Sequence, residues 1–205
     1  MILNKPLDEL FSTWSDIAVM RVLKSYSTGL TGREIARLSK MTPRSAIRAL
    51  SGLEELGVIT RIRGGRDHLF SLNREHFLVK EIVLPVLENE EKFRDAVYLE
   101  IRQSLKDRCN SVYVFGSVPR KEEKVESDLD LCVIYDSEEQ REGVEEAFEE
   151  LRSELFIKYG VNASPFYISA SEFSEKAKDK KQPVKDIVKE GEMVFGNSIG
   201  SLVNG

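Results

Sequence analysis

The sequence has few cysteines, few prolines and no long apolar run. Its two cysteines are too few for a disulfide framework or a thiolate metal site, and Cys132, in the run LDLCVIY, is expected to be a small buried residue. No hydrophobic stretch reaches the roughly 20 residues that span a bilayer, and the N-terminus lacks the features of a signal peptide. These absences indicate a cytoplasmic globular protein with no membrane partner.

The two parts of the 205-residue chain carry opposite net charges. Residues 1–74 hold 12 Lys and Arg against 7 Asp and Glu, a net charge of +5. The remaining residues hold 18 against 28, a net charge of −10, and the two values give the chain's −5. This asymmetry predicts two domains with different partners.

The first domain, expected at residues 1–74, opens with apolar residues at helical spacing from Leu7 to Leu23, Trp14 included. Thr31 and Glu34 have the spacing of a capping box, which predicts the start of a second helix.

A third helix is predicted from Thr42, a good N-cap, and Pro43, which suits the first helical position. Gly57 is expected to end it, and its buried face is expected to comprise Ile47, Leu50, Leu53 and Leu56. Two short strands follow, joined by a turn at Gly64 and Gly65.

Three helices and a glycine-tipped hairpin, in LTGREIARLSKMTPRSAIRALSGLEELGVITRIRGGRDHLFSLN, resemble the winged helix-turn-helix domains of bacterial and archaeal regulators. The resemblance implies DNA binding, with the third helix in the major groove and the hairpin, or wing, on the backbone or minor groove. The guanidinium group of arginine can donate two parallel hydrogen bonds to a guanine edge or to a phosphate. The residues expected to face DNA are Thr42, Arg44, Ser45, Arg48, Arg61, Arg63 and Arg66. A protein-docking module with solvated arginines is the alternative.

Residues 75–91 are expected to form a helical linker that Pro85 breaks or kinks. The side chains expected to pack on the first domain are Phe77, Ile82, Leu84 and Leu87. A buried stripe is expected on the next helix at Phe93, Val97, Ile101 and Leu105. Part of this segment is also a candidate dimer helix, and a homodimer is expected because such regulators bind paired half-sites.

The stretch FGSVPRKEEKVESDLDL places two carboxylates, Asp128 and Asp130, at the start of an apolar strand. Side chains alternate along a strand, so both point to one face. Close carboxylates repel unless a cation compensates, and Mg²⁺ or Mn²⁺ binds through such a pair together with phosphate oxygens. Gly116 lets the backbone approach a phosphate, and Ser117 can donate to it. The pattern predicts a site for a nucleoside triphosphate and a divalent metal.

The Gly-Ser pair, the ten residues after it and the Asp-Leu-Asp resemble the nucleotidyltransferase superfamily that includes DNA polymerase β and kanamycin nucleotidyltransferase, above all its minimal prokaryotic members. The resemblance implies an α/β domain with a small mixed sheet at residues 92–200, and an α+β fold class for the chain. It implies that Gly116 and Ser117 bind nucleotide phosphates and that Asp128 and Asp130 are the catalytic metal ligands. Arg120 is a further candidate phosphate contact.

Members of that superfamily use a third carboxylate on a neighbouring strand. The expected strand, VNASPFYIS, carries Asn162 and Ser164 and no acid, and loop acids are the remaining candidates: Glu122, Glu123 and Glu126. The sequence thus predicts a DNA-binding transcriptional regulator with a nucleotide-binding domain of weak or no catalytic activity. The alternatives are an active nucleotidyltransferase acting on a small molecule or partner protein, and a pure interaction module. The final residues, SIGSLVNG, are expected to be loose.

Overall fold

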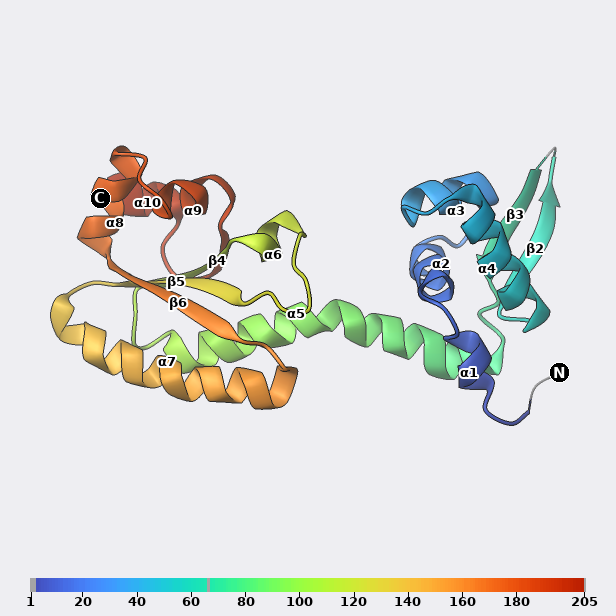
Figure 1. The fold of residues 1–205 in the computed structure, drawn as a ribbon, viewed down its shortest axis with the longest axis horizontal. Coiled ribbons are helices and arrows are strands. Elements are labelled where there is room, and N and C mark those ends of the chain that lie inside the picture. Colours follow the sequence, from blue (N-terminus) through green and yellow to red (C-terminus); the bar gives the residue numbers. More distant parts are fainter. Residues whose placement is uncertain (1–2, 66, 205) are drawn as a thin grey trace. The chain divides into compact units, whose positions relative to one another are not determined.

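The computed structural model describes residues 3–65 and 67–204 of the chain (Figure 1). Contacts divide the chain into two compact units, an N-terminal unit, Met1–Lys92, and a C-terminal unit, Phe93–Gly205. Each unit combines helices with one small sheet, so the predicted α+β fold class is confirmed. None of the helices in the described ranges has the length and hydropathy that crossing a bilayer demands.

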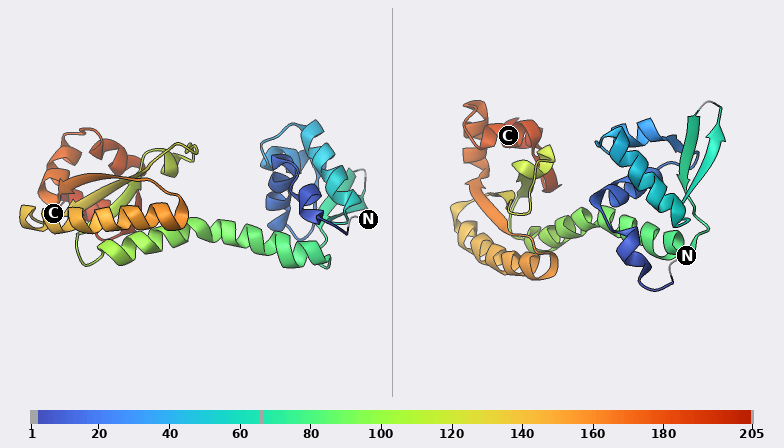
Figure 2. Two further views of the ribbon diagram at one scale, coloured as in Figure 1. Left: turned by 60° about the horizontal axis from the view of Figure 1, so that its bottom comes forward. Right: turned by 45° about the vertical axis from the view of Figure 1, so that its right-hand side comes forward.

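The N-terminal unit consists of short helices and a three-stranded antiparallel sheet of order β1-β3-β2. The hairpin of β2 and β3 extends beyond the helices of this unit (Figure 2). This order of helices followed by a hairpin agrees with the predicted winged-helix domain. Its elements are α1 (Pro6–Leu10), α2 (Trp14–Lys24), β1 (Leu30–Thr31), α3 (Gly32–Leu38), α4 (Pro43–Glu55), β2 (Ile59–Gly64) and β3 (Asp67–Leu72).

The helix boundaries in this unit follow from local capping. The Thr31 hydroxyl accepts a hydrogen bond from the Glu34 backbone N–H at 3.3 Å, and the Glu34 carboxylate accepts one from the Thr31 N–H at 2.8 Å. At α4, Thr42 accepts from the Ser45 N–H at 3.2 Å, and Gly57 takes a φ of 76° just after the helix. The predicted caps are confirmed.

The predicted single helix from Leu7 to Leu23 is wrong, because the chain breaks between α1 and α2. Thr13 caps α2 in a capping box with Asp16, which supplies a local alternative to continued helix. Trp14 then lies at the first position of α2 with 64% of its surface exposed, so it does not belong to the core.

Ile47 also differs from the prediction, because it is 47% exposed. The buried face of α4 is formed by Ala46, Ala49, Leu50 and Leu53. The two alanines allow neighbouring elements to approach this face closely, and Ile47 lies at its edge, where its side chain only partly contacts α3.

The predicted disturbance at Pro85 takes the form of a π-helical turn, η1 (Val79–Val83), which runs directly into α5 (Leu84–Leu105). A wider turn accommodates the missing N–H and the ring of proline. Leu87 is buried in the core of the N-terminal unit, as predicted, together with Val79 and Val83. Phe77 is 71% exposed, which contradicts its predicted packing.

The C-terminal unit is built on a four-stranded mixed sheet of order β6-β5-β4-β7, in which only β5 and β6 are parallel. A long helix, α7, connects these two strands, as parallel pairing requires. The elements after α5 are β4 (Ser111–Phe115), α6 (Ser117–Arg120), β5 (Leu129–Tyr135), α7 (Glu138–Tyr159), β6 (Ala163–Ser169), α8 (Ala170–Lys178), α9 (Val184–Glu190), β7 (Glu192–Phe195) and α10 (Ile199–Asn204).

Helices cover both faces of this sheet (Figure 1). On one face Leu131 and Val133 pack with apolar residues of α7 and of the later turns of α5. On the other face Cys132 and Ile134 pack with residues of α8, α9 and α10. The predicted stripe on α5 is confirmed for Val97, Ile101 and Leu105, whereas Phe93 is 49% exposed.

The predicted loose tail is wrong, because residues 199–204 form α10. Leu202 is 7% exposed and belongs to the same core cluster as Cys132 and Phe173. Ile199 packs against the same cluster, and the Ser174 hydroxyl of α8 donates a hydrogen bond to the Val203 carbonyl at 3.1 Å, so several contacts hold α10.

Candidate functional site

The predicted nucleotide site lies at one end of the sheet in the C-terminal unit, where β4 turns through Gly116 into α6. Gly116 has φ 78° and ψ −137°, a conformation open to glycine. A Cβ atom at this position would lie 2.2 Å from Oδ2 of Asp130. The glycine is therefore needed both for the turn and for the close approach of the carboxylate.

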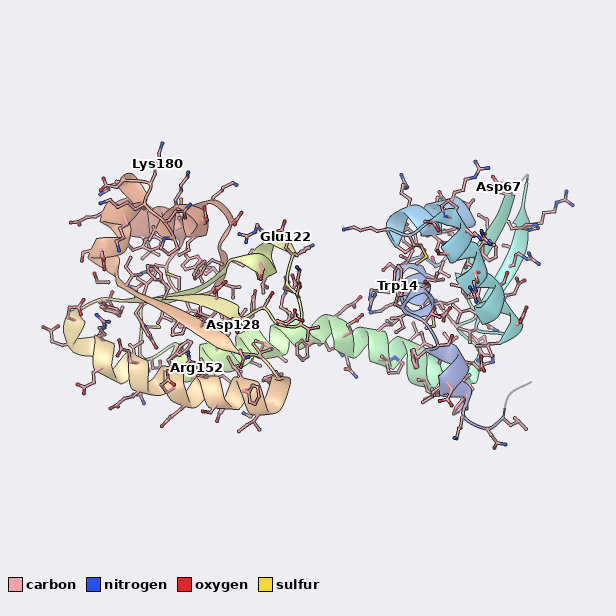
Figure 3. The ribbon with its side chains drawn as sticks, viewed as in Figure 1. Trp14, Asp67, Glu122, Asp128, Arg152 and Lys180 are labelled. Atoms are coloured by element: carbon pink, nitrogen blue, oxygen red, sulfur yellow. The ribbon has the colours of Figure 1, made fainter. Side chains whose placement is uncertain are left out.

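Asp128 directly precedes β5 (Figure 3), and Asp130 is the second residue of that strand. Leu129 between them is buried on the α5 and α7 face, so alternation directs the two aspartates to the other face. Burial, then the nearby Asp128 carboxylate, raise the pKa of Asp130, and Arg120 acts in the opposite direction. Among the described residues neither aspartate forms an ion pair or a side-chain hydrogen bond.

The third position of the predicted carboxylate set is occupied by serine. Asp130 pairs in register with Ser164 on β6 and with Phe115 on β4. Phe115 contacts Phe166 edge-on at 6.4 Å between ring centroids. Within residues 3–65 and 67–204, no three acidic, histidine or cysteine side chains are grouped so that they could hold a metal ion.

The two aspartates nevertheless fit one divalent cation. Both donors are hard carboxylate oxygens expected on one face of the sheet, and Asp130 lies against Gly116, where the absence of a Cβ allows its close approach. The loop acid Glu122, considered as a third ligand, is instead paired with Arg120.

Arg120 is held by two glutamates. Its Nη1 lies 2.6 Å from Oε1 of Glu190 at the end of α9, and its Nε lies 3.1 Å from Oε2 of Glu122. Hydrogen bonds to Glu190 and Glu122 raise the pKa of the guanidinium. Sequence reasoning did not find Glu190, because it is 70 residues away from Arg120 along the chain.

The predicted DNA-facing residues lie on two elements of the N-terminal unit. On α4, Arg44 and Arg48 are exposed, and neither has an ion-pair partner in the described ranges. Thr42 and Ser45 contact each other, hydroxyl to hydroxyl, at 2.9 Å as part of the helix cap. The exposed stripe of α4 also includes Ile47, which sequence reasoning placed in the core.

On the hairpin, Arg61 and Arg63 are exposed on β2. Arg61 pairs with Glu54 of α4 at 3.1 Å, so its charge is partly compensated within the unit. Arg66 lies outside the described residues.

Comparison with known protein families gives a match for the C-terminal unit. Residues 98–197 match the model of the nucleotidyltransferase domain. The match contains the whole candidate site, from Gly116 to Ser164. A search of curated proteins finds no match.

Several solved structures are distantly similar to the chain. One is described as a toxin-antitoxin with AMP-PNP, at 16% identity and a TM-score of 0.34, covering 52% of this chain and 80% of that one. Another is MepR, a transcription regulator of the Staphylococcus aureus multidrug efflux pump MepA. It has 17% identity and a TM-score of 0.35, and the similarity covers 73% of this chain and 84% of MepR. A Lactococcus lactis ZitR mutant in apo form has 18% identity and a TM-score of 0.33, and the similarity covers 73% of this chain and 86% of ZitR.

Proposed function

We propose that this protein is a DNA-binding transcriptional regulator whose nucleotidyltransferase domain binds a nucleoside triphosphate with Mg²⁺ or Mn²⁺ and turns it over slowly or not at all. The N-terminal unit supplies the DNA contacts as half of a homodimer, and the C-terminal unit responds to the nucleotide. The observation that carries the nucleotide part is the Asp130 carboxylate, which lies against Gly116 and has no ion-pair partner among residues 3–65 and 67–204.

The charge of the N-terminal unit supports DNA binding. Residues 31–65, which include α3, α4 and β2, contain 7 Lys and Arg against 3 Asp and Glu. Arg44, Arg48 and Arg63 are exposed, and each is free to meet a phosphate or a guanine edge without first breaking an ion pair within the described structure.

The nucleotide site is assigned from its donors. Asp128 and Asp130 would hold the cation, which supplies charge neutralisation for the phosphates. Gly116 leaves the backbone accessible, and Ser117 is positioned directly after it to donate to a phosphate oxygen. To bind a phosphate, the Arg120 guanidinium would release the carboxylate of Glu190 or Glu122 and donate the same hydrogen bond to a phosphate oxygen.

Weak catalysis follows from Ser164. A serine hydroxyl next to Asp130 neither accepts a proton as a carboxylate does nor adds negative charge to anchor a second cation. Nucleotide binding without efficient transfer suits a sensor, because the bound ligand persists long enough to change the affinity of the chain for DNA.

Titration of ATP with Mn²⁺ into the full chain, followed by calorimetry, tests the nucleotide part. Binding is expected for the wild type and is expected to be lost in Asp130→Asn. Asp107→Asn, which removes an exposed carboxylate after α5, is the matched control and should bind normally. Equal binding by the wild type and Asp130→Asn would place the nucleotide elsewhere.

Binding of a labelled randomised DNA duplex, with and without ATP and Mn²⁺, tests the regulatory part. The expected result is binding that Arg48→Ala weakens and that the nucleotide changes. Arg141→Ala, on α7, should leave DNA affinity unchanged. If neither ligand binds, both units act as interaction modules and the proposal fails.

The alternative is an active nucleotidyltransferase, which the match of residues 98–197 favours. It would use Glu123 or Glu126, exposed in the loop before β5, as the missing acid, and would transfer a nucleotide to a small molecule or partner protein. Multiple-turnover release of pyrophosphate, abolished by Asp128→Asn, would decide in favour of this alternative.

A further inference from the structure

The exposed side of α4 contains an isoleucine between two arginines. Residues 44, 47, 48 and 51 follow the spacing of one helical stripe, and all four are exposed. Ile47 has 47% of its surface exposed. The residues of α4 that alternate with this stripe, among them Ala46 and Leu50, are buried.

The Ile47 side chain lies against a glycine on the neighbouring helix. A Cβ atom at Gly32, the first residue of α3, would lie 2.7 Å from Cδ1 of Ile47. Gly32 does not have a positive φ, so its backbone conformation does not require glycine. Because Gly32 has no Cβ, the Ile47 side chain can contact α3 there, and about half of its surface stays exposed to solvent.

Ile47 also lines a hollow on the surface of the N-terminal unit. The hollow has a volume of about 260 Å³ and lies between α3, α4 and the hairpin. Its polar lining includes Ser51 of α4 with Arg61 and His68 of the hairpin. A single exposed apolar residue is common on protein surfaces, but this one lies in a hollow of mixed polar and apolar lining that the two elements proposed to contact DNA share.

We propose that Ile47 reads the 5-methyl group of thymine in the major groove. This inference rests on the proposed DNA-binding function and adds a specificity-determining residue to it. The thymine methyl is the one apolar group that a base pair presents in the major groove, and apolar side chains recognise it by contact. A β-branched side chain has few rotamers to lose on binding, and Arg44 and Arg48 on either side supply the contacts to phosphate or guanine.

Replacement of thymine by uracil tests this inference, because it removes only the methyl group. A preferred duplex is first selected from a randomised library with the full chain at fixed salt. Uracil then replaces each thymine in turn, and Kd is measured by fluorescence anisotropy. At one or two thymines per half-site the wild type should lose about fourfold in affinity, the value for one buried methyl-sized group. Ile47→Ala should bind the thymine and uracil duplexes equally.

Two variants serve as controls. Ile62, on β2, is also an exposed isoleucine, with 59% of its surface accessible. Ile62→Ala should retain the preference for thymine, because the wing is proposed to contact the backbone or minor groove, where no methyl is presented. Gly32→Ala should displace Cδ1 of Ile47 and reduce the preference while leaving Ile47 in the sequence.

The possible outcomes separate the inference from the function on which it rests. If the wild type binds no duplex, the proposed DNA-binding function fails and the inference fails with it. If the wild type binds a selected duplex with equal affinity for thymine and uracil, or if Ile47→Ala keeps the wild-type preference, DNA binding stands and the role of Ile47 is wrong. Loss of the preference in Ile47→Ala, with retention in Ile62→Ala, is the result that supports it.

Discussion

The two units place their candidate functional groups in opposite physical settings. In the N-terminal unit the arginines of α4 and β2 are exposed. In the C-terminal unit the key carboxylate, Asp130, belongs to a strand whose following residues are all buried. Exposed arginines can be added to an existing fold, whereas a partly buried carboxylate such as Asp130 depends on the strands that surround it.

This difference affects how each unit tolerates change. The proposed DNA binding would be spread over several exposed arginines, each contributing a share of the phosphate contacts. The proposed nucleotide binding would depend on Asp130 and on Gly116, where one added methyl group would collide with the carboxylate. Single substitutions are therefore expected to weaken the first activity gradually and to abolish the second.

The largest expected effects come from truncating the two cores separately. Phe148 is fully buried in the C-terminal unit and contacts Tyr167 edge-on, and Leu50 is fully buried in the N-terminal unit. Phe148→Ala should cost about 3–5 kcal/mol and Leu50→Ala about 2–5 kcal/mol of unfolding free energy. Urea denaturation should show each substitution moving one transition, because the two core clusters share no residue. A shift of both transitions by either variant would mean that the units unfold together.

The next effect concerns Asp130, for which function and stability are expected to oppose each other. Asp130→Asn should abolish binding of Mn²⁺ with ATP and slightly stabilise the fold at pH 7, by less than about 1 kcal/mol because the carboxylate is partly solvated. Its pKa is raised in the folded state, so the folded protein favours the protonated form. The contribution of Asp130 to the free energy of unfolding should therefore increase as pH falls through its folded-state pKa. Over the same pH range the affinity for the metal should fall, because the carboxylate becomes protonated.

Thermal unfolding and Mn²⁺ titration between pH 4 and 7 measure both quantities, with Asp107→Asn as the exposed control. A fall in stability of the wild type relative to Asp130→Asn on acidification would contradict the stated sign.

Sequence reasoning succeeded where a signal is local. The capping box of Thr31 and Glu34, the Thr42 cap and the glycine after α4 depend on residues within a few positions of each other, so their spacing alone identifies them. The equally local capping box of Thr13 and Asp16 was missed. Sequence reasoning failed where packing between distant segments decides. Ile47 fits a helical apolar pattern as well as Leu50 does, and only the tertiary contacts of Ala46 and Ala49 select the buried side. Glu190 meets Arg120 through the fold and has no local signature.

The caps provide a prediction of intermediate size within the N-terminal unit. Thr31→Ala and Thr42→Ala should each cost about 1 kcal/mol, because each removes a hydroxyl that accepts from a helix N-terminal N–H. Replacement by serine, which keeps the hydroxyl, should restore most of the loss. Equal destabilisation by alanine and serine in urea denaturation would show that the methyl group, and not the cap, stabilises these helices.

The smallest expected effect concerns the contact between Arg120 and Glu190. If Arg120 binds phosphate, the Glu190 carboxylate at 2.6 Å competes for the same guanidinium. Glu190→Gln should remove this competition and tighten ATP binding in the presence of Mn²⁺ by roughly two- to fivefold, a fraction of one charge-assisted hydrogen bond. Arg120→Ala should weaken binding, and in that background Glu190→Gln should have no further effect. Calorimetry on the four proteins of this cycle measures the coupling. Weaker binding by Glu190→Gln alone would instead mean that Glu190 holds Arg120 in its binding position, so that the same ion pair supports the site.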